Sequence, residues 1–423
     1  MATTTRTPAD VCRAAKAASR PLAALPAGVK DAALTAIADA LLLRRDEILE
    51  ANARDLDAGR AADIGSALLD RLTLTPERIA GMAEGVRQVA ALPDPVGEVL
   101  DGGRLDNGLR VERVRVPLGV VAVVYEARPN VTIDAAALAL KSGNAIVLRG
   151  SSTALHSNAI LAAVAAEAAE GAGVPAGAIS LVSGGGREEL AELATQEGVV
   201  DLIIPRGGEG LKNALKGVAT VPVIFAASGV CHVYVDASAD LDAAREIILN
   251  AKTQRPGVCN AAETLLVHSS VAATFLPDAL GALDAAGVEL RVDARTRAAA
   301  GDGAPALLDA TDEDWGTEYL DLILTVGVVD SVGEAIEHVV TYGSGHSDAI
   351  LTEDLASADA FVAGVDSAAV YVNASTRFTD GAEFGMGAEI GISTQKLHAR
   401  GPIGLRELCT YKYVVQGAGH VRP

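Results

Sequence analysis

Cys259 is the residue of this chain whose type and setting most clearly indicate chemistry. It lies in the segment Arg255-Pro256-Gly257-Val258-Cys259-Asn260, between two long stretches in which predicted strands and helices alternate. A thiol in a Gly/Pro loop between two such domains can face a cofactor cleft, where its thiolate attacks an activated carbonyl. An isolated cysteine is more often a small buried hydrophobic residue, so this chemistry needs support from other positions.

Two glycine-rich loops follow predicted strands, at residues 183–186 and 206–210. The backbone N–H groups of such loops, at the start of a helix, can bind phosphate. Neither loop has the full GxGxxG spacing of a dinucleotide fingerprint, and simple tight turns explain them equally well. The candidate cofactor ligands in these loops are Ser183, Gly184, Gly207 and Gly208.

Arg149 ends the predicted strand 145–148 and is followed by Ser151 and Ser152. In dinucleotide-binding folds an adenosine ribose often lies at such a strand end, and a basic residue there suits a 2′-phosphate better than an acidic one. Arg149 therefore favours NADP(H) over NAD(H), with an ordinary surface arginine as the alternative.

The pattern of strands and helices must position these residues. A chain of 423 residues exceeds one ordinary core, and with 3% aromatic residues its cores must be built from Ala, Val, Leu and Ile. Continuous apolar runs that alternate with helices predict doubly wound parallel sheets. The predicted strands are 120–124, 145–148, 179–182, 202–204, 221–225 and 232–235 before Cys259, and 264–267, 288–292, 322–326, 349–352 and 369–372 after it.

Other segments complete the predicted organisation. The first hundred residues read as helices, and Asn107-Gly108 favours a tight hairpin within a ribbon of mixed charged and apolar residues. Residues 409–415 alternate as one late strand. We expect a cofactor-binding domain from 1–103 and 118–252, a catalytic domain from 253–400, and a small β element from 104–117 and 401–423.

Composition excludes several classes of partner. The formal charge of −20 disfavours nucleic acid and anionic lipid, and no apolar run is long enough to span a membrane. The four cysteines form no CxxC pair, so neither a disulfide framework nor a structural zinc site is expected, and no cluster has metal-ligand spacing. We expect no metal and a cytoplasmic location.

Three longer stretches carry a specific resemblance: YEARPNVT at 125–132, GVCHVYVD at 229–236 and FGMGAEIGIST at 384–394. Together with Cys259 they resemble the gamma-glutamyl phosphate reductases, a branch of the aldehyde dehydrogenase superfamily, and the likeness covers nearly the whole chain. The resemblance implies an α/β, aldehyde-dehydrogenase-like fold of two doubly wound domains plus a small β bridging and oligomerisation element.

The resemblance also implies residue roles. Cys259 would be the nucleophile and Asn130 the side chain that stabilises the oxyanion. Glu318 would hold the nicotinamide ribose, and Arg149 the adenosine end of NADPH. A turn-former after a proline remains the alternative for Asn130, and a solvated carboxylate for Glu318.

The implied reaction is NADPH-dependent reduction of L-glutamyl 5-phosphate to L-glutamate 5-semialdehyde and phosphate through a Cys259 thioester, the second step of proline biosynthesis from glutamate. Hydrolytic members of the superfamily carry a glutamate that activates water, whereas this chain has Ala226-Ala227-Ser228-Gly229 at the corresponding place. Removing a positioned base slows hydrolysis by roughly 10²–10⁴-fold. The candidates for contacting the substrate's charged groups are Arg128, Arg255, Arg377, Asp380 and Glu383.

Two alternatives remain open. The chain could be a hydrolytic NAD(P)-dependent aldehyde dehydrogenase, which the missing carboxylate disfavours. It could also be a catalytically silent scaffold for the kinase that makes glutamyl phosphate. The presence of Cys259, Asn130 and Glu318 disfavours this alternative. The resemblance further implies a homodimer or higher homo-oligomer, because an isolated hairpin is only marginally stable in water, and leaves room for a complex with glutamate 5-kinase.

Overall fold

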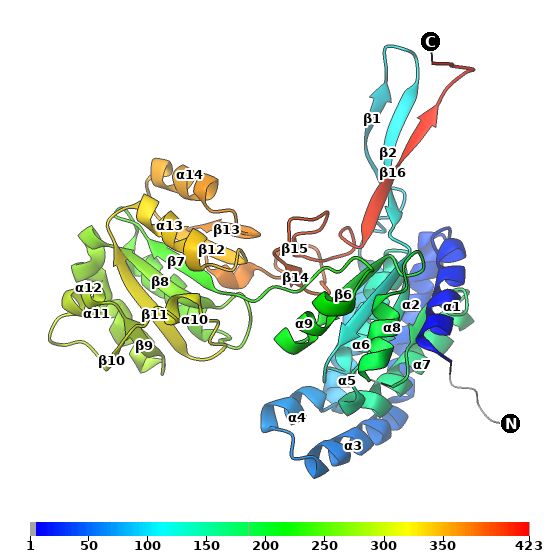
Figure 1. The fold of residues 1–423 in the computed structure, drawn as a ribbon, viewed down its shortest axis with the longest axis horizontal. Coiled ribbons are helices and arrows are strands. Elements are labelled where there is room, and N and C mark those ends of the chain that lie inside the picture. The colour runs from blue at the N-terminus through cyan, green and yellow to red at the C-terminus, as the bar shows by residue number, and fades with distance from the viewer. Residues whose placement is uncertain (1–5, 185, 423) are drawn as a thin grey trace. The chain divides into compact units, whose positions relative to one another are not determined.

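The computed structural model describes residues 6–184 and 186–422 (Figure 1). The chain divides into two compact units. The first comprises Met1–Ala226, Gly385–Gly391 and Ile403–Pro423, and the second comprises Ala227–Phe384 and Ile392–Pro402.

A parallel four-stranded sheet forms the centre of the first unit, with the strand order β5-β4-β3-β6. Every residue of the two central strands β3 and β4 is buried, as a parallel sheet covered on both faces requires. The strands are β3 (Val120–Tyr125), β4 (Ala145–Arg149), β5 (Ile179–Leu181) and β6 (Leu202–Arg206).

Helices cover this sheet. Thr75 caps one of these helices, because its Oγ1 accepts a hydrogen bond from the N–H of Arg78 at 3.2 Å and Pro76 starts the helix. The helices are α1 (Pro8–Leu22), α2 (Ala27–Leu43), α3 (Arg45–Ala61), α4 (Ser66–Leu72), α5 (Pro76–Ala91), α6 (Asn130–Lys141), α7 (Leu155–Gly171), α8 (Arg187–Ala194) and α9 (Glu209–Val218), with a short 3₁₀ turn η1 (Ser152–Ala154).

One predicted strand, 221–225, is wrong. Only an isolated bridge between Ile203 and Val223 forms there. Pro222 has no N–H to donate to a ladder, so a longer strand beside β6 is disfavoured. The chain then leaves the first unit at Ala226.

The predicted ribbon is present, and it starts earlier than expected. β1 (Val99–Arg104) and β2 (Arg110–Pro117) form a hairpin, and β16 (Cys409–Gln416) pairs antiparallel with β2 along its whole length (Figure 1). Gly108 has a φ of +88°, the left-handed conformation for which the sequence favoured Asn-Gly. The late strand is thus confirmed as part of the same small sheet.

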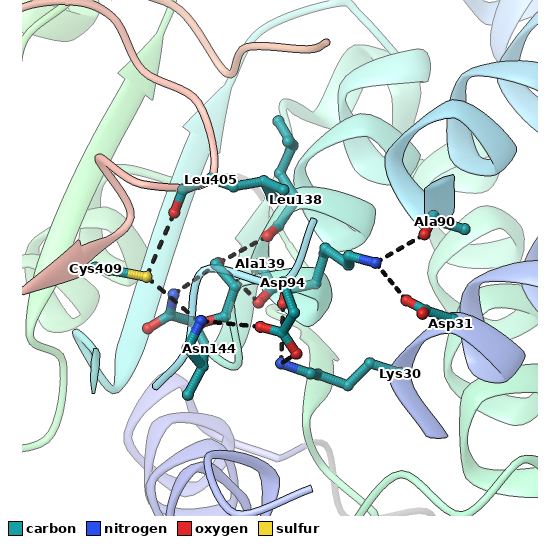
Figure 2. A network of polar contacts seen from close by, with 12 residues as sticks. Lys30, Asp31, Ala90, Asp94, Leu138, Ala139, Asn144, Leu405 and Cys409 are labelled. Atoms are coloured by element: carbon teal, nitrogen blue, oxygen red, sulfur yellow. Dashed lines mark hydrogen bonds and ion pairs between the residues drawn. The ribbon is translucent and has the colours of Figure 1, made fainter. Parts of the chain in front are cut away.

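A buried polar network anchors the base of this ribbon in the first unit (Figure 2). The Asn144 side chain accepts a hydrogen bond from the Gly119 N–H and donates one to the Leu408 carbonyl, both at 2.8 Å, immediately before β16 begins. The ammonium of Lys30, whose side chain is 1% exposed, lies 2.5 Å from the Asp94 carboxylate. Removing one partner of such a buried pair costs about 3–5 kcal/mol, so the ribbon's base is fixed to the helical layer.

The second unit contains a parallel sheet of seven strands in the order β10-β9-β11-β8-β7-β12-β13. Residues 233 and 235 belong to a core cluster shared with α10 (Leu241–Thr253) and α11 (Ser269–Ala285). Tyr234 belongs to a second cluster shared with α13 (Val332–Tyr342) and α14 (Leu355–Gly364). This alternation shows that helices cover both faces of the sheet. The strands are β7 (Cys231–Val235), β8 (Ala262–His268), β9 (Glu289–Val292), β10 (Leu307–Asp309), β11 (Ile323–Val329), β12 (Ser347–Leu351) and β13 (Ala369–Val372).

The remaining elements of the second unit are five helices and several short pieces within its described part. They are α10 (Leu241–Thr253), α11 (Ser269–Ala285), α12 (Ala294–Ala300), α13 (Val332–Tyr342), α14 (Leu355–Gly364), the 3₁₀ turns η2 (Asp314–Gly316) and η3 (Thr376–Phe378), and a two-stranded pair β14 (Ile392–Ser393) and β15 (Gly401–Pro402).

The division between the units differs from the expected one. The sequence placed residues up to 252 in the first domain, whereas the structure divides the chain between Ala226 and Ala227. The physical reason is strand pairing, because β7 lies between β8 and β12 in the seven-stranded sheet and α10 packs against α11 and β8. Residues 403–423, expected to act with 401 and 402, return to the first unit.

Candidate active site

Cys259 lies in the nucleophile loop, defined here as residues 254–261 between α10 and β8. The thiol is partly buried and forms no disulfide. Asn260 fastens the loop, because its Nδ2 donates to the Thr379 carbonyl at 2.9 Å and its own carbonyl accepts from the Thr376 hydroxyl at 2.7 Å. The loop is therefore held against η3 and the residues that follow it.

The carbonyl group of Cys259 is held from a second side by the segment that leads into β7. A Cβ added at Gly229 would lie 1.5 Å from the Cys259 carbonyl oxygen and 2.8 Å from its Cα. Cys231 donates its S–H to the same carbonyl at 3.2 Å, and burial raises the pKa of the Cys231 thiol well above its usual range. Cys231 is thus a neutral donor, and only glycine fits at position 229.

Glu318 lies on the third side. Its Oε1 accepts a hydrogen bond from the Gly229 N–H at 2.7 Å. Two residues further along, the Leu320 N–H donates to Glu263 at 3.4 Å, and Glu263 forms a fully buried ion pair with Lys252 at 2.6 Å. Lys252 and Glu263 lie on either side of the nucleophile loop in sequence, so this pair joins its two ends to the Glu318 segment.

The structure brings three of the expected substrate-binding residues into the neighbourhood of Cys259. Burial and the charge of Arg255 lower the pKa of Arg377, while Cys259 and Asp380 act in the opposite direction. The Nε of Arg377 donates to the Gln254 side chain at 2.9 Å. Arg255 is exposed and has no hydrogen bond or ion pair among the described residues. Two guanidinium groups thus supply positive charge around the thiol.

Asp380 and Glu383 differ in their surroundings. Asp380 Oδ1 accepts hydrogen bonds from the N–H groups of Ala382 and Glu383, at 2.9 and 3.4 Å, so this carboxylate shapes its own turn. The Glu383 side chain is exposed. Of the two carboxylates, Asp380 is the one whose charge acts on Arg377.

Asn130 begins α6 of the first unit. It is exposed, and its Nδ2 donates to Asp134 Oδ2 at 2.9 Å. Burial raises the pKa of Asp134 to about 6, opposed by the Asn130 hydrogen bond and the charge of Arg206. Arg128, just before the helix, is partly buried. An amide has two Nδ2 hydrogens, so Asn130 keeps a second donor.

Arg149 lies at the carboxyl end of β4 and fits the phosphorylated end of a dinucleotide. It is buried, its Nη2 donates to the Gly186 carbonyl at 2.8 Å, and its Nε is a buried donor without a partner among the described residues. The nearby Ser151 hydroxyl is also buried, and it too has no hydrogen-bond partner among the residues that the structure describes. Unmatched donors at this edge of a parallel sheet suit an anionic group.

Glutamates contact both glycine loops, which the sequence reading missed. Glu189 accepts a hydrogen bond from the Gly186 N–H at 2.5 Å, and a Cβ at Gly184 would lie 2.1 Å from the same carboxylate. Glu126 accepts from the Gly208 N–H at 3.0 Å and lies against Gly207. The third-residue spacing of Glu189 after Gly186 is a capping-box signal, whereas nothing local predicts Glu126. Ser183 is exposed.

No helix among the described residues is long and apolar enough to cross a membrane. Within the same residues, no group of three or more His, Cys, Asp or Glu side chains has an arrangement that could hold a metal ion.

Comparison with known proteins agrees with this geometry. The profile of the aldehyde dehydrogenase family matches residues 2–300. A gamma-glutamyl phosphate reductase of Kineococcus radiotolerans is 57% identical over 97% of this chain and 95% of its own length. One from Thermobifida fusca is 55% identical over 97% and 98%. The crystal structure of gamma-glutamyl phosphate reductase from Thermotoga maritima is similar, with a TM-score of 0.96 and 48% identity over 99% of this chain and 100% of that chain.

The chain belongs to the aldehyde dehydrogenase family, whose members are oxidoreductases that use nicotinamide dinucleotides. Within that family, the chain is highly similar to gamma-glutamyl phosphate reductases. The predicted resemblance and the predicted fold class are therefore both confirmed.

The raised pKa of Asp134 predicts a pH-dependent stability. The folded protein holds this proton more tightly than the unfolded chain, so the resulting stabilisation is present below about pH 4 and is lost as the pH rises through about 6. The stability of the native protein relative to Asp134→Asn should fall by up to about 3 kcal/mol across that window. Urea unfolding of both proteins from pH 4 to 7 measures the difference. A difference that stays constant over this range would contradict the assignment.

Proposed function

We propose that the protein reduces L-glutamyl 5-phosphate to L-glutamate 5-semialdehyde and phosphate, with NADPH as the cofactor. This is the second step of proline biosynthesis from glutamate. Support comes from the names of relatives that are 57% and 55% identical over almost the whole chain. The observation that carries the proposal is Cys259 itself, a partly buried thiol whose loop is fixed on three sides and flanked by arginines.

The protein's own groups account for the acyl transfer. The Cys259 thiolate attacks the acyl carbon, the bond from that carbon to the phosphate oxygen breaks, and phosphate leaves with the electron pair. Arg255 and Arg377 compensate the charges of the phosphate and carboxylate groups, because guanidinium forks match both. Arg128 is a further candidate for these anions, and Asp380 or Glu383 for the ammonium group.

Asn130 is the proposed oxyanion donor. Its family position supports this role, and the contact with Asp134 leaves one Nδ2 hydrogen for the developing charge. The segment Ala226-Ala227-Ser228-Gly229 carries no carboxylate, so it supplies no general base to activate water. Because this segment cannot activate water, it does not promote hydrolysis of the thioester on Cys259.

NADPH supplies a hydride when it is bound. Arg149 would hold its 2′-phosphate, with Ser183, Gly184, Gly207 and Gly208 near the other phosphates and Glu318 on the nicotinamide ribose. The unmatched donors of Arg149 and Ser151 support the phosphate assignment. Glu126 and Glu189 would have to release the loop N–H groups that they now hold, or share them.

An assay in the oxidative direction tests the function. With L-glutamate 5-semialdehyde, NADP⁺ and inorganic phosphate, NADPH formation should depend on phosphate, because phosphate is the acceptor that cleaves the thioester. Cys259→Ala should lose the activity, with Cys12→Ala, a buried cysteine on α1, as the matched control.

Other results would favour the alternatives. NADPH formation without phosphate would indicate a hydrolytic aldehyde dehydrogenase. Restoration of proline synthesis by Cys259→Ala in a proline-requiring host would indicate a scaffold for the kinase. A complex with glutamate 5-kinase and a cytoplasmic location remain predictions.

We also propose a homo-oligomer formed through the ribbon. β16 is an edge strand whose Tyr411, Tyr413 and Val415 are 46%, 62% and 56% exposed. An apolar edge strand pairs readily with a strand of another chain. Light scattering at micromolar concentration should show at least a dimer, and Tyr413→Glu with Val415→Lys should shift it to the monomer. A native monomer would contradict the proposal.

A further inference from the structure

The hydrogen bond between Glu318 and Gly229 indicates a role for this carboxylate in addition to the proposed contact with the cofactor ribose. We infer that Glu318 is a positioning residue that fixes the orientation of Cys259, through Gly229, before any cofactor binds. The inference rests on the proposed thioester chemistry, since it concerns the residue that carries the acyl group.

Gly229 transmits position because it has no free space toward Cys259. The Cβ position of Gly229 lies 1.5 Å from the Cys259 carbonyl oxygen and 2.4 Å from the carbonyl carbon. At such distances the two backbones are in direct contact, and a shift of Gly229 must move the Cys259 peptide. The one hydrogen bond of the Gly229 N–H in the described structure is to Glu318 Oε1, at 2.7 Å.

Two other contacts around Cys259 are fixed by the core, so the position of the Gly229 backbone is the one that Glu318 can change. Cys231 holds the same carbonyl at 3.2 Å from within β7, and Asn260 is fastened to Thr379 at 2.9 Å. Both belong to the buried body of the second unit. Glu318, by contrast, lies in the irregular segment after η2 and is only partly buried. Its carboxylate therefore sets where the Gly229 backbone comes to rest.

The segment that carries Glu318 is itself braced. Leu320 has a φ of +54°, a left-handed conformation that costs a leucine about 1–2 kcal/mol. Its N–H donates to Glu263, whose other oxygen lies 2.6 Å from Lys252, and both side chains of that pair are buried. A strained turn persists only where its surroundings fix it, and here the bracing pair flanks the nucleophile loop.

A carboxylate has a second oxygen, which explains how the two tasks are compatible. Oε1 holds Gly229, and Oε2 remains for a ribose hydroxyl. Cofactor binding and the orientation of the thiol would then share one side chain.

The test uses the cofactor-free protein and p-nitrophenyl acetate as the acyl probe. The Cys259 thiolate attacks the ester carbonyl, the carbon–oxygen bond breaks, and p-nitrophenolate leaves as an acetyl thioester forms. The rate of the nitrophenolate burst reports this step without NADPH. Glu318→Ala removes both the charge and the hydrogen-bond acceptor, whereas Glu318→Gln removes the charge and keeps an acceptor. Their comparison isolates the hydrogen bond from any effect of charge on the thiol.

We expect the burst rate of Glu318→Ala to be about tenfold below that of Glu318→Gln, because small displacements of reacting groups are costly. Glu313→Ala is the matched control, since Glu313 lies just before η2, is exposed, and its side chain has no partner among the described residues. Its burst should match the native one. Circular dichroism checks that Glu318→Ala is folded. If it is not, Glu318→Asp replaces it, because the shorter side chain places the carboxylate farther from Gly229.

Equal burst rates in the alanine and glutamine variants would overturn the inference, because a ribose contact alone leaves the cofactor-free reaction unchanged. A burst that survives in Cys259→Ala would overturn the thioester function and the inference together. A burst that is lost in Cys259→Ala but equal in the two Glu318 variants overturns the inference alone.

Discussion

The close approach of the Gly229 backbone to the Cys259 carbonyl is the constraint on which the arrangement of the second unit depends. Any side chain at position 229 would overlap this carbonyl. The approach joins the start of β7 to the loop before β8, two strands that are neighbours in the sheet. Hydrogen bonds from Cys231 and Asn260, and the carboxylate of Glu318 on Gly229, then hold the contact in one geometry.

The positive charge near Cys259 is opposite in sign to the net charge of the whole chain. The chain carries a formal charge of −20, yet Arg255 and Arg377 lie near the thiol and influence each other. Each glycine loop of the first unit has a glutamate on its N–H groups. A loop N–H that donates to an internal carboxylate is also suited to a phosphate, since both are anions bound by the same donors. The internal contacts keep these polar groups satisfied in the protein alone.

Local sequence patterns predicted much of the fold. The strand at 369–372 has the predicted bounds, because its run of apolar residues has a clear start and end. The strand predicted at 221–225 failed because Pro222 cannot join a ladder. The three-residue strand β10 was missed, since so short a run has no periodicity. The unit boundary was misplaced because chain order does not reveal that β7 pairs with β8.

The candidate site was predictable where single residues carry chemistry, and not where contacts between distant segments do. Cys259 and Arg377 could be named from residue type and resemblance. The Lys252–Glu263 pair reads in sequence as two surface charges, and its burial follows only from the packing of α10 on the sheet. Cys231 likewise looks like an ordinary strand residue, 28 positions before the carbonyl that it contacts.

Direct detection of the acyl group on Cys259 tests the central claim. The protein is mixed with L-glutamate 5-semialdehyde and NADP⁺ without phosphate, quenched in acid and digested, and its peptides are weighed by mass spectrometry. We expect a glutamyl group on the peptide that contains Cys259, released by hydroxylamine and absent when phosphate is supplied. A glutamyl group on another residue, or turnover with no acylated peptide at any time, would contradict it.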